Sequence, residues 1–282
     1  MCITFFLVND SKDSSIPYKF ILAFNRDEVI GRETLPLHAW SDDPNIIGGR
    51  DVHAGGTWIA VNVKTGNIAL LTNVVWKGWK RKGKSLSRGK LTSNFLATDF
   101  YEKWLRTSKF ELSKQDYSAI ARDYCKKILE EKDKYNGFNL IVGNLKALCF
   151  WYCGNYCSKE MPIEISNGIH SLSNLDFTRK YEKEKLGASL FEELIKKVSQ
   201  EKDEEMLFSG LAEIMQNQKK FDDFKSSIFV PWTRKFLFWV YGTTCTTYIT
   251  LDKENHLTIR EQTYEGSPDK SFCIKPKVFQ LD

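Results

Sequence analysis

Residues 1–8 read MCITFFLV, and residues 18–28 read YKFILAFNRDE. The first stretch is a short apolar run rich in β-branched and aromatic residues, which predicts a buried strand over 3–8. The second stretch predicts a strand over 18–24, and the polar segment NDSKDSSIP between them predicts a turn. We therefore expect an antiparallel hairpin, in which the NRDE end of the second strand meets the start of the first strand.

The residue at the start of that first strand is Cys2, and its position has two interpretations. Cys2 is either a small buried residue that begins a strand, or a nucleophile exposed when Met1 is removed. In the second case the free α-amine titrates near ~7.7–8.0, so that it can accept the proton of its own thiol. A cysteine of this kind needs no histidine partner.

The stretch NRDE places Asn25, Arg26, Asp27 and Glu28 directly after an apolar run. Four polar residues in succession predict the end of a strand, where functional groups tend to project. An arginine beside an aspartate can bind a carboxylate or a phosphate, and the carboxylate can orient an amine or a guanidinium. The hairpin therefore predicts a functional pocket that contains Cys2 and this polar group.

A second strand end is predicted at Asn73, where LLTN closes an apolar run. Its amide is suited either to donate to an oxyanion or to cap a turn. The loop that follows, WKGWKRKGKSLSRGK, interleaves tryptophans with basic residues, namely Lys77, Lys80, Arg81, Lys82, Lys84, Arg88 and Lys90. This pattern is typical of a surface for phosphates or membrane headgroups, and a solvated loop is the alternative.

Composition limits the classes of function. The net charge of +5 over 282 residues is mild, which disfavours nucleic acid as a partner. No apolar run approaches the ~18 residues of a membrane span, and the first ten residues lack the basic region of a secretory signal. The glycine pairs 48–49 and 55–56 fit neither a dinucleotide fingerprint nor a P-loop. We therefore expect an intracellular protein that is not secreted.

The order of predicted elements favours an α+β fold in a single domain, 1–282. A polar loop is expected between the NRDE stretch and a hairpin formed by TWIAVN and NIALLTN. Strands are also expected in FNLIVGN, in ALCFWYC and in three stretches at the C-terminal end. Hairpin-like connections favour mainly antiparallel sheets with helices layered on them. Helical periodicity is seen over residues 90–105, 115–131, 176–198 and 203–216.

Seven cysteines occur in the sequence, and their odd number without a secretory signal argues against a disulfide framework. Cys149, Cys153 and Cys157 stand four residues apart in CFWYCGNYC. Residues four apart share one face of a strand, which favours packed thiols over a zinc site. No histidines stand at a metal-binding spacing, so we expect no metal site.

Several motifs together resemble those of the NRDE family, also called the Transport and Golgi organisation protein 2 family. They are MCI at the start, FNRDE, GGRD at residues 48–51, GGTW, LTN and SRG at residues 87–89. Later stretches, YNGFNLIVG, GIHSLSN and YGTTCTTYITLD, are similar as well. The resemblance follows the same order over nearly the whole chain.

The resemblance implies an αββα sandwich similar to that of N-terminal-nucleophile hydrolases. It implies a ligand pocket formed by Cys2, Asn25, Arg26, Asp27, Glu28, Arg50, Asp51 and Arg88. In a hydrolase of this kind Cys2 would be both nucleophile and base. Arg26 and Asp27 would orient it, and Asn73 would donate to the oxyanion. Whether the chain is an enzyme stays open, because a shared fold does not establish activity.

The family association favours haem trafficking between compartments as the first functional hypothesis, with haem as cargo and no required cofactor. An acyl-CoA or lipid-handling protein and an amidohydrolase acting on acyl conjugates are the alternatives. The basic loop favours peripheral contact with a membrane, and the family implies cytoplasm, mitochondria or Golgi. The chain departs from the family pattern at Thr244, where an arginine is expected.

Overall fold

The computed structural model describes seven stretches of the chain: residues 2–74, 85–97, 112–156, 160–201, 203–221, 227–235 and 239–281. The chain divides into two compact units built from interleaved segments. Unit 1 contains Met1–Arg32, Asn167–Ser173 and Thr178–Gln280; unit 2 contains Glu33–Ser166, Asn174–Phe177 and Leu281–Asp282. The single domain over 1–282 stays a prediction.

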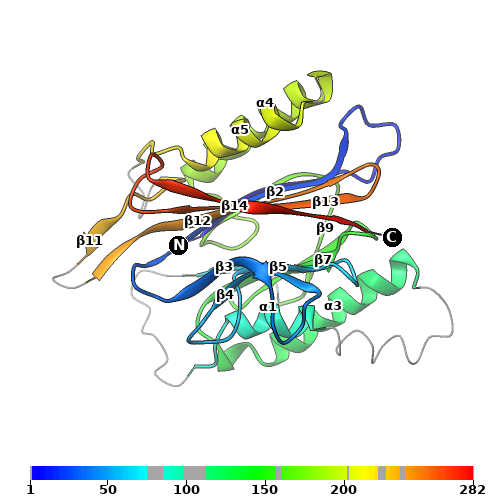
Figure 1. The fold of residues 1–282 in the computed structure, drawn as a ribbon. Coiled ribbons are helices and arrows are strands. Elements are labelled where there is room, and N and C mark those ends of the chain that lie inside the picture. Colours follow the sequence, from blue (N-terminus) through cyan, green and yellow to red (C-terminus); the bar gives the residue numbers. More distant parts are fainter. Residues whose placement is uncertain are drawn as a thin grey trace. The chain divides into compact units, whose positions relative to one another are not determined.

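Unit 1 is built on an antiparallel sheet whose central strands come from both ends of the chain (Figure 1). The strand order is β10-β1-β2-β12-β13-β14, and β11 pairs only with β12. The strands are β1 (Ile3–Val8), β2 (Tyr18–Val29), β10 (Gly168–Leu172), β11 (Thr233–Lys235), β12 (Trp239–Asp252), β13 (His256–Tyr264) and β14 (Ser271–Gln280).

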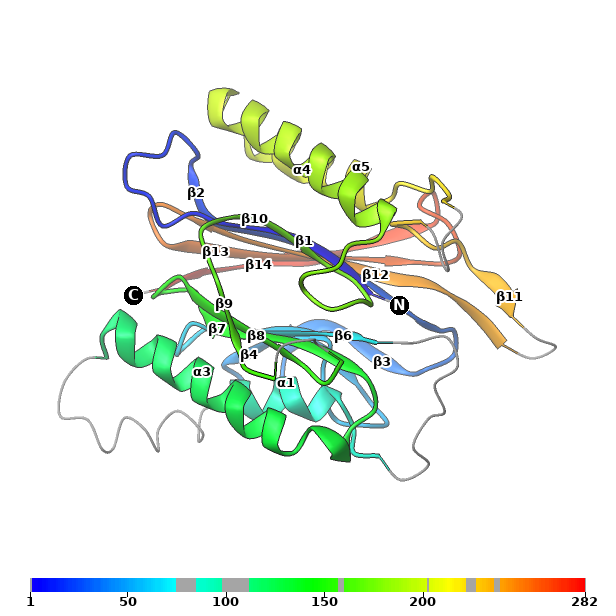
Figure 2. The ribbon, with the colours of Figure 1, turned by 180° about the vertical axis from the view of Figure 1, so that it is seen from behind.

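Two helices, α4 (Glu182–Glu201) and α5 (Glu204–Met215), cover one face of this sheet (Figure 2). Their apolar residues form one core with the β1 side chains Ile3, Phe5 and Leu7. Gly187 allows the close approach of α4, because a Cβ atom there would lie 2.0 Å from the Phe5 ring. The side chains of β1 that alternate with these three therefore point to the opposite face of the sheet.

Unit 2 is built on a second antiparallel sheet, in the order β3-β4-β5-β6-β7-β8-β9. Gly66, with a positive φ of 78°, closes the turn between β5 and β6. Helices α1 (Gly89–Leu96) and α3 (Lys114–Glu130) share one hydrophobic core with this sheet, and a 3-10 turn (Lys132–Lys134) follows α3. The strands are β3 (Thr34–Ala39), β4 (Ile46–Asp51), β5 (Ile59–Asn62), β6 (Asn67–Asn73), β7 (Phe138–Asn144), β8 (Cys149–Gly154) and β9 (Ile163–Ile165).

The predicted α+β class with mainly antiparallel sheets is confirmed, since every strand pair within the two sheets is antiparallel. Each unit supplies one α layer and one β layer, as an αββα sandwich requires. The predicted hairpins β1–β2, β5–β6 and β7–β8 are all present. Among the described residues, no helix is both long and apolar enough to span a membrane.

Three local predictions are wrong. The NRDE stretch does not end its strand, because β2 continues through it to Val29 and stays paired with β12 along its length. The polar loop expected after it instead forms the hairpin β3–β4. The helix expected from residue 176 begins at Glu182, after a loop that contains the buried Asp176. The predicted helix over 90–105 is described only to Leu96.

Candidate functional site

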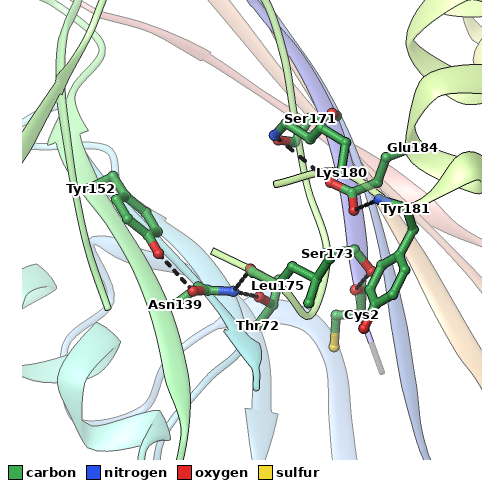
Figure 3. Close-up of polar contacts among 10 residues, drawn as sticks. All are labelled: Cys2, Thr72, Asn139, Tyr152, Ser171, Ser173, Leu175, Lys180, Tyr181 and Glu184. Atoms are coloured by element: carbon green, nitrogen blue, oxygen red, sulfur yellow. Dashed lines mark hydrogen bonds and ion pairs between the residues drawn. The ribbon is translucent and has the colours of Figure 1, made fainter. Parts of the chain in front are cut away.

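Cys2 lies directly before β1, and its backbone is held from the neighbouring strand β10. The pairing Thr4↔Leu172, continued by one position, sets Ser173 opposite Ile3 and next to Cys2. There the Ser173 hydroxyl donates a 3.0 Å hydrogen bond to the Cys2 carbonyl oxygen (Figure 3). Ser173 is fully buried and Cys2 is 5% exposed. The backbone of Cys2 is therefore held in place at the start of β1.

The register of the sheet brings the NRDE stretch to Cys2, as the hairpin predicted. Ile3 pairs with Asn25, so the same register continued by one position sets Cys2 beside Arg26. On the other side of β2, Arg26 pairs with Cys245 of β12. Directly paired residues share a face of an antiparallel sheet. Two buried thiols therefore flank one guanidinium, and this row of Cys2, Arg26 and Cys245 is called the thiol–Arg row below.

The Arg26 guanidinium is held by a residue that projects from an irregularity in β12. The register shifts between Thr243 and Cys245, which leaves Thr244 outside the regular pairing. Arg26 Nη1 donates to Thr244 Oγ1 at 2.9 Å, and the same hydroxyl donates to the Arg26 carbonyl oxygen at 3.1 Å. The Thr244 hydroxyl thus contacts both the guanidinium and the backbone of Arg26 and can position the Arg26 side chain.

Asp27 is 2% exposed and belongs to a buried hydrogen-bonded chain. The Val230 amide donates to Thr243 Oγ1 at 2.9 Å, and that hydroxyl donates to Asp27 Oδ1 at 2.7 Å. Tyr241 donates its phenol hydrogen to the Asp27 carbonyl oxygen at 3.1 Å. Polar residues can thus continue a buried strand because β12 provides hydroxyl groups opposite them.

Asn25 points to the helix side of the sheet, away from Cys2 and Arg26. Its amide donates to the carbonyl oxygens of Met215 and Ile228 at 2.8 and 3.0 Å, and it accepts from Thr246 at 2.6 Å. These bonds anchor the end of α5 to β2. Glu28 is half-buried and accepts a 2.8 Å hydrogen bond from the Val29 amide. The ligand-binding roles of both residues stay predictions.

Burial raises the pKa of the Cys2 thiol, and the Asp27 carboxylate raises it further. The positive amino terminus, a hydrogen bond from the backbone of Asp27 and the charge of Arg26 lower it by less. The pKa of Cys245 is raised well above its ordinary value, first by burial and then by the buried Glu261 carboxylate. Both thiols therefore carry their protons at neutral pH, and a base or a metal must take the proton before either sulfur can react.

Several residues near the thiol–Arg row were not predicted, including Ser173, Cys245 and Glu261. A further polar group lies at the start of α4, where the Tyr181 amide donates to Glu184 at 3.1 Å and Lys180 donates to the Ser171 carbonyl oxygen (Figure 3). Lys183 is 1% exposed there. In the sequence, only the threonine-rich stretch TTCTT pointed to the strand that contains Cys245. That stretch does not show that Cys245 pairs with Arg26, because the pairing depends on the register between the two strands.

The other predicted pocket residues belong to unit 2, where each has structural contacts. Arg50 forms a two-fold ion pair with Asp42, at 2.5 and 2.6 Å, which lowers the pKa of that carboxyl group. Asp51 accepts from the Ala54 amide at 2.8 Å within a turn. Arg88 donates to the Gly137 carbonyl oxygen at 2.9 Å. Their ligand-binding roles stay predictions.

Asn73 ends β6 as predicted, and its carbonyl oxygen accepts a 2.6 Å hydrogen bond from Asn174 Nδ2. Nearby, the buried Asn139 amide donates to Thr72 Oγ1 at 3.1 Å and to the Leu175 carbonyl oxygen at 2.7 Å (Figure 3). These bonds hold the segment 174–177 to the unit 2 sheet. The proposed role of Asn73 as an oxyanion donor stays a prediction.

The basic loop residues Lys77, Lys80, Arg81, Lys82 and Lys84 lie outside the described residues, and so does Cys157. Cys149 and Cys153 are buried on β8, and Cys153 contacts Cys125 of α3 in the unit 2 core. Cys149 and Cys153 are thus buried thiols of β8, and the prediction for the set of three stays a prediction. Within the described stretches, no group of three histidine, cysteine or acidic side chains is arranged to hold a metal ion.

Comparison with known proteins gives one family and several relatives. The family described as Transport and Golgi organisation 2 matches residues 1–266. The human protein named Transport and Golgi organization protein 2 homolog is 29% identical over 281 residues, covering 93% of this chain and 92% of the human protein. The mouse homolog is 28% identical with the same coverage, and the Drosophila melanogaster protein is 25% identical over 94% of this chain and 93% of its own length.

Proposed function

Because the chain belongs to the Transport and Golgi organisation 2 family, we propose that it is an intracellular transport protein that binds haem as cargo at the thiol–Arg row. The name of its relatives supports the transport role. The finer assignment to haem rests on the chemistry of the row itself. The proposal includes a location in the cytoplasm, or at mitochondrial or Golgi membranes.

The observation that carries this proposal is a buried thiol beside a buried guanidinium. A cysteine sulfur is an established axial ligand of haem iron, and an arginine is suited to bind a propionate in two-fold geometry. Cys2 and Arg26 are each 5% exposed and lie side by side on the unit 1 sheet. Thr244 holds the guanidinium, so little side-chain freedom is lost when an anion binds.

The raised pKa of Cys2 predicts how the affinity for haem changes with pH. The thiol holds its proton at neutral pH, and coordination to iron requires the thiolate. Binding therefore releases a proton, so affinity rises as the pH rises, by up to ~tenfold per pH unit below the thiol pKa. Cargo is released more easily in a more acidic environment.

The first experiment is a spectroscopic titration of the protein with haem, followed at the Soret band. Cys2→Ala is compared with Cys273→Ala, which removes the exposed free cysteine of β14. We expect Cys2→Ala to change the Soret position and to weaken binding at least tenfold, while Cys273→Ala leaves both unchanged. Equal spectra and affinities for the two variants would contradict ligation by Cys2.

The same titration tests whether the Arg26 guanidinium binds a haem propionate. Arg26→Lys keeps the charge but removes the two-fold geometry, so we expect affinity to fall while the Soret position is retained. Arg122→Lys, at an exposed position of α3, is the matched control. An unchanged affinity for Arg26→Lys would show that the propionate is bound elsewhere.

A second candidate, hydrolysis of acyl conjugates by an N-terminal cysteine, is favoured by the way Cys2 is held. Ser173 fixes its carbonyl oxygen, and the Asp27 backbone forms a hydrogen bond with its thiol. Once Met1 is removed, the free α-amine accepts the thiol proton and the sulfur attacks the acyl carbon. The acyl–nitrogen bond breaks, the amine of the conjugate leaves with the transferred proton, and water then hydrolyses the thioester to release the acid and the free thiol. The intact mass of the protein purified from its own cells tests this directly, because retention of Met1 excludes the mechanism.

A further inference from the structure

A ribbon extends from one end of the unit 1 sheet, where β11 pairs only with the start of β12, and β2 joins it at Tyr241, which also pairs with Val29 (Figures 1 and 2). Its pairs are Thr233↔Tyr241, Arg234↔Val240 and Lys235↔Trp239. No residue of the thiol–Arg row belongs to this ribbon. The described residues Thr233–Lys235 and Trp239–Tyr241 are called the β11–β12 ribbon below.

The ribbon exposes a large aromatic side chain at its far end. Trp239 is 57% exposed, whereas Trp232 at the base is half-buried and donates its indole hydrogen to the Thr243 carbonyl oxygen at 2.9 Å. A tryptophan side chain exposed to water does not contribute the large hydrophobic stabilisation that burial of its ring would provide. Tryptophan is also the residue most enriched at membrane–water interfaces, where its ring and its N–H group are both accommodated.

The charge of the ribbon is positive. Arg234 is exposed and Lys235 is its neighbour, while the sequence contains no acidic residue between Asp223 and Asp252. In sequence, the three residues between the two strands are Phe-Leu-Phe, which add no charge. Basic residues beside a tryptophan match a bilayer surface that carries anionic headgroups.

Exposed carboxylates lie at the base of the ribbon. Glu265 and Asp269 lie in the turn between β13 and β14, where the Gly266 carbonyl oxygen accepts from the Trp232 amide. That turn is at the base of the ribbon, beside Trp232. An anionic surface is therefore met by the end that carries Trp239, and the base stays in water.

From these observations we propose that the β11–β12 ribbon is a docking element for anionic lipid membranes. A ribbon of this size is too small for a stable protein interface, which buries ~800 Å² on each partner. A lipid surface needs no complementary shape, since aromatic and basic side chains partition into it individually. A bilayer is therefore favoured over a second copy of this chain.

The same strand links this ribbon to the thiol–Arg row. β12 runs without a break from Trp239 to Thr244, which is a distance of ~17 Å at ~3.3 Å per residue. Docking through the ribbon would hold the row close to the lipid headgroups. Membrane binding itself does not depend on haem, so the two proposals can fail separately.

The test is flotation of the haem-free full chain with phosphatidylcholine vesicles, with and without phosphatidylserine. We expect the protein to float only with the anionic vesicles, and to be released by high salt. Trp239→Ser and the double variant Arg234→Glu/Lys235→Glu are each expected to lower the bound fraction at least tenfold. Wild-type protein that does not float with phosphatidylserine vesicles would overturn the proposal.

Matched controls come from β14 of the same unit. Val278→Ser removes a side chain that is 62% exposed, and Lys275→Glu/Lys277→Glu inverts two neighbouring charges. These variants are expected to float like wild type, and all variants should show unchanged melting temperatures. Equal losses for the β14 and ribbon variants would overturn the proposal in favour of general adsorption.

Two further readouts identify the contact itself. Brominated lipids should quench the fluorescence of wild type more than that of Trp239→Phe, because this tryptophan enters the interface. Sedimentation without vesicles is measured for wild type and Trp239→Ser in parallel. Self-association that is lost in Trp239→Ser, combined with unchanged flotation, would assign the ribbon to a second copy of the chain and overturn membrane docking.

Discussion

Both units bury polar side chains in their sheets, but the chemistry of these side chains differs. In unit 1 the buried polar side chains include three charged groups of the sheet, Arg26, Asp27 and Glu261, which are 5%, 2% and 2% exposed. In unit 2 the buried cluster at the β5–β6 turn is neutral, with Asn62 and Asn144 bonded to backbone groups. Neutral amides stabilise turns at low cost, whereas a buried charge loses several kcal/mol of hydration. Folding alone therefore accounts for the unit 2 cluster, and function is the better explanation for the unit 1 charges.

The cysteines divide in the same way. Cys125 and Cys153 of unit 2 lie in an apolar core between α3 and β8. Cys2 and Cys245 of unit 1 lie next to Arg26, and their pKa values respond to Asp27 and Glu261 respectively. A thiol whose pKa depends on nearby charges is a candidate for chemistry, whereas a thiol in an apolar core contributes mainly to packing.

The largest expected effect is a loss of stability when the neutral cluster of unit 2 is disrupted. Asn144→Ala removes three hydrogen bonds, to Thr65, Asn67 and Ala147, and leaves these buried groups without a partner. We expect the free energy of unfolding to fall by ~3 kcal/mol, measured by urea denaturation. Haem binding by the folded protein should be unchanged. A loss of affinity without a loss of stability would reverse the assignment of the cluster to structure.

A second prediction uses pH to examine a unit 2 thiol. Burial raises the pKa of Cys149 from 9.0 to about 11. The folded state therefore keeps a proton that the unfolded state loses, so stability is intact below pH 9 and falls as the pH rises toward 11. The contribution is ~2–3 kcal/mol. In thermal melts from pH 8 to 11, Cys149→Ala should lose less stability than wild type, and Cys273→Ala should behave as wild type.

A third prediction tests the charge in unit 1 directly. Asp27→Asn keeps an oxygen for Thr243 but removes the negative charge that raises the pKa of Cys2. The pKa of Cys2 should therefore fall, which increases the thiolate fraction at fixed pH by up to ~tenfold. The pH dependence of Cys2 alkylation, followed by mass spectrometry, should shift to lower pH. Asp269→Asn, in an exposed turn, serves as control and should show no shift.

The smallest expected effect concerns the positioning of Arg26. Thr244→Val removes the hydroxyl that contacts both the guanidinium and the backbone of Arg26. We expect a loss of ~1 kcal/mol in the free energy of unfolding and a few-fold weaker affinity for haem. Thr233→Val, at an exposed position of β11, is the control. Affinity equal to wild type would show that Thr244 does not orient the guanidinium.

Much of the fold followed from local patterns. The apolar run of β1, the two strands closed by Gly66 and the amphipathic spacing of α3 each depend on a few neighbouring residues. The antiparallel hairpin β1–β2 also placed Cys2 beside the NRDE stretch, because the end of one antiparallel strand meets the start of its partner. The predicted end of β2 was wrong because the groups that satisfy NRDE come from β12, more than 200 residues away in sequence.

The sequence by itself determined most of the secondary structure, the α+β class and the position of Cys2 beside the NRDE stretch, since these depend on alternation, turn residues and the order of the strands. Only the tertiary structure decided that Cys245 flanks Arg26, that Thr244 holds its guanidinium and that Ser173 fixes Cys2. The physical reason is that a buried polar group must find hydrogen-bond partners, and long-range strand pairing supplies those partners. No local pattern encodes which distant strand becomes the neighbour.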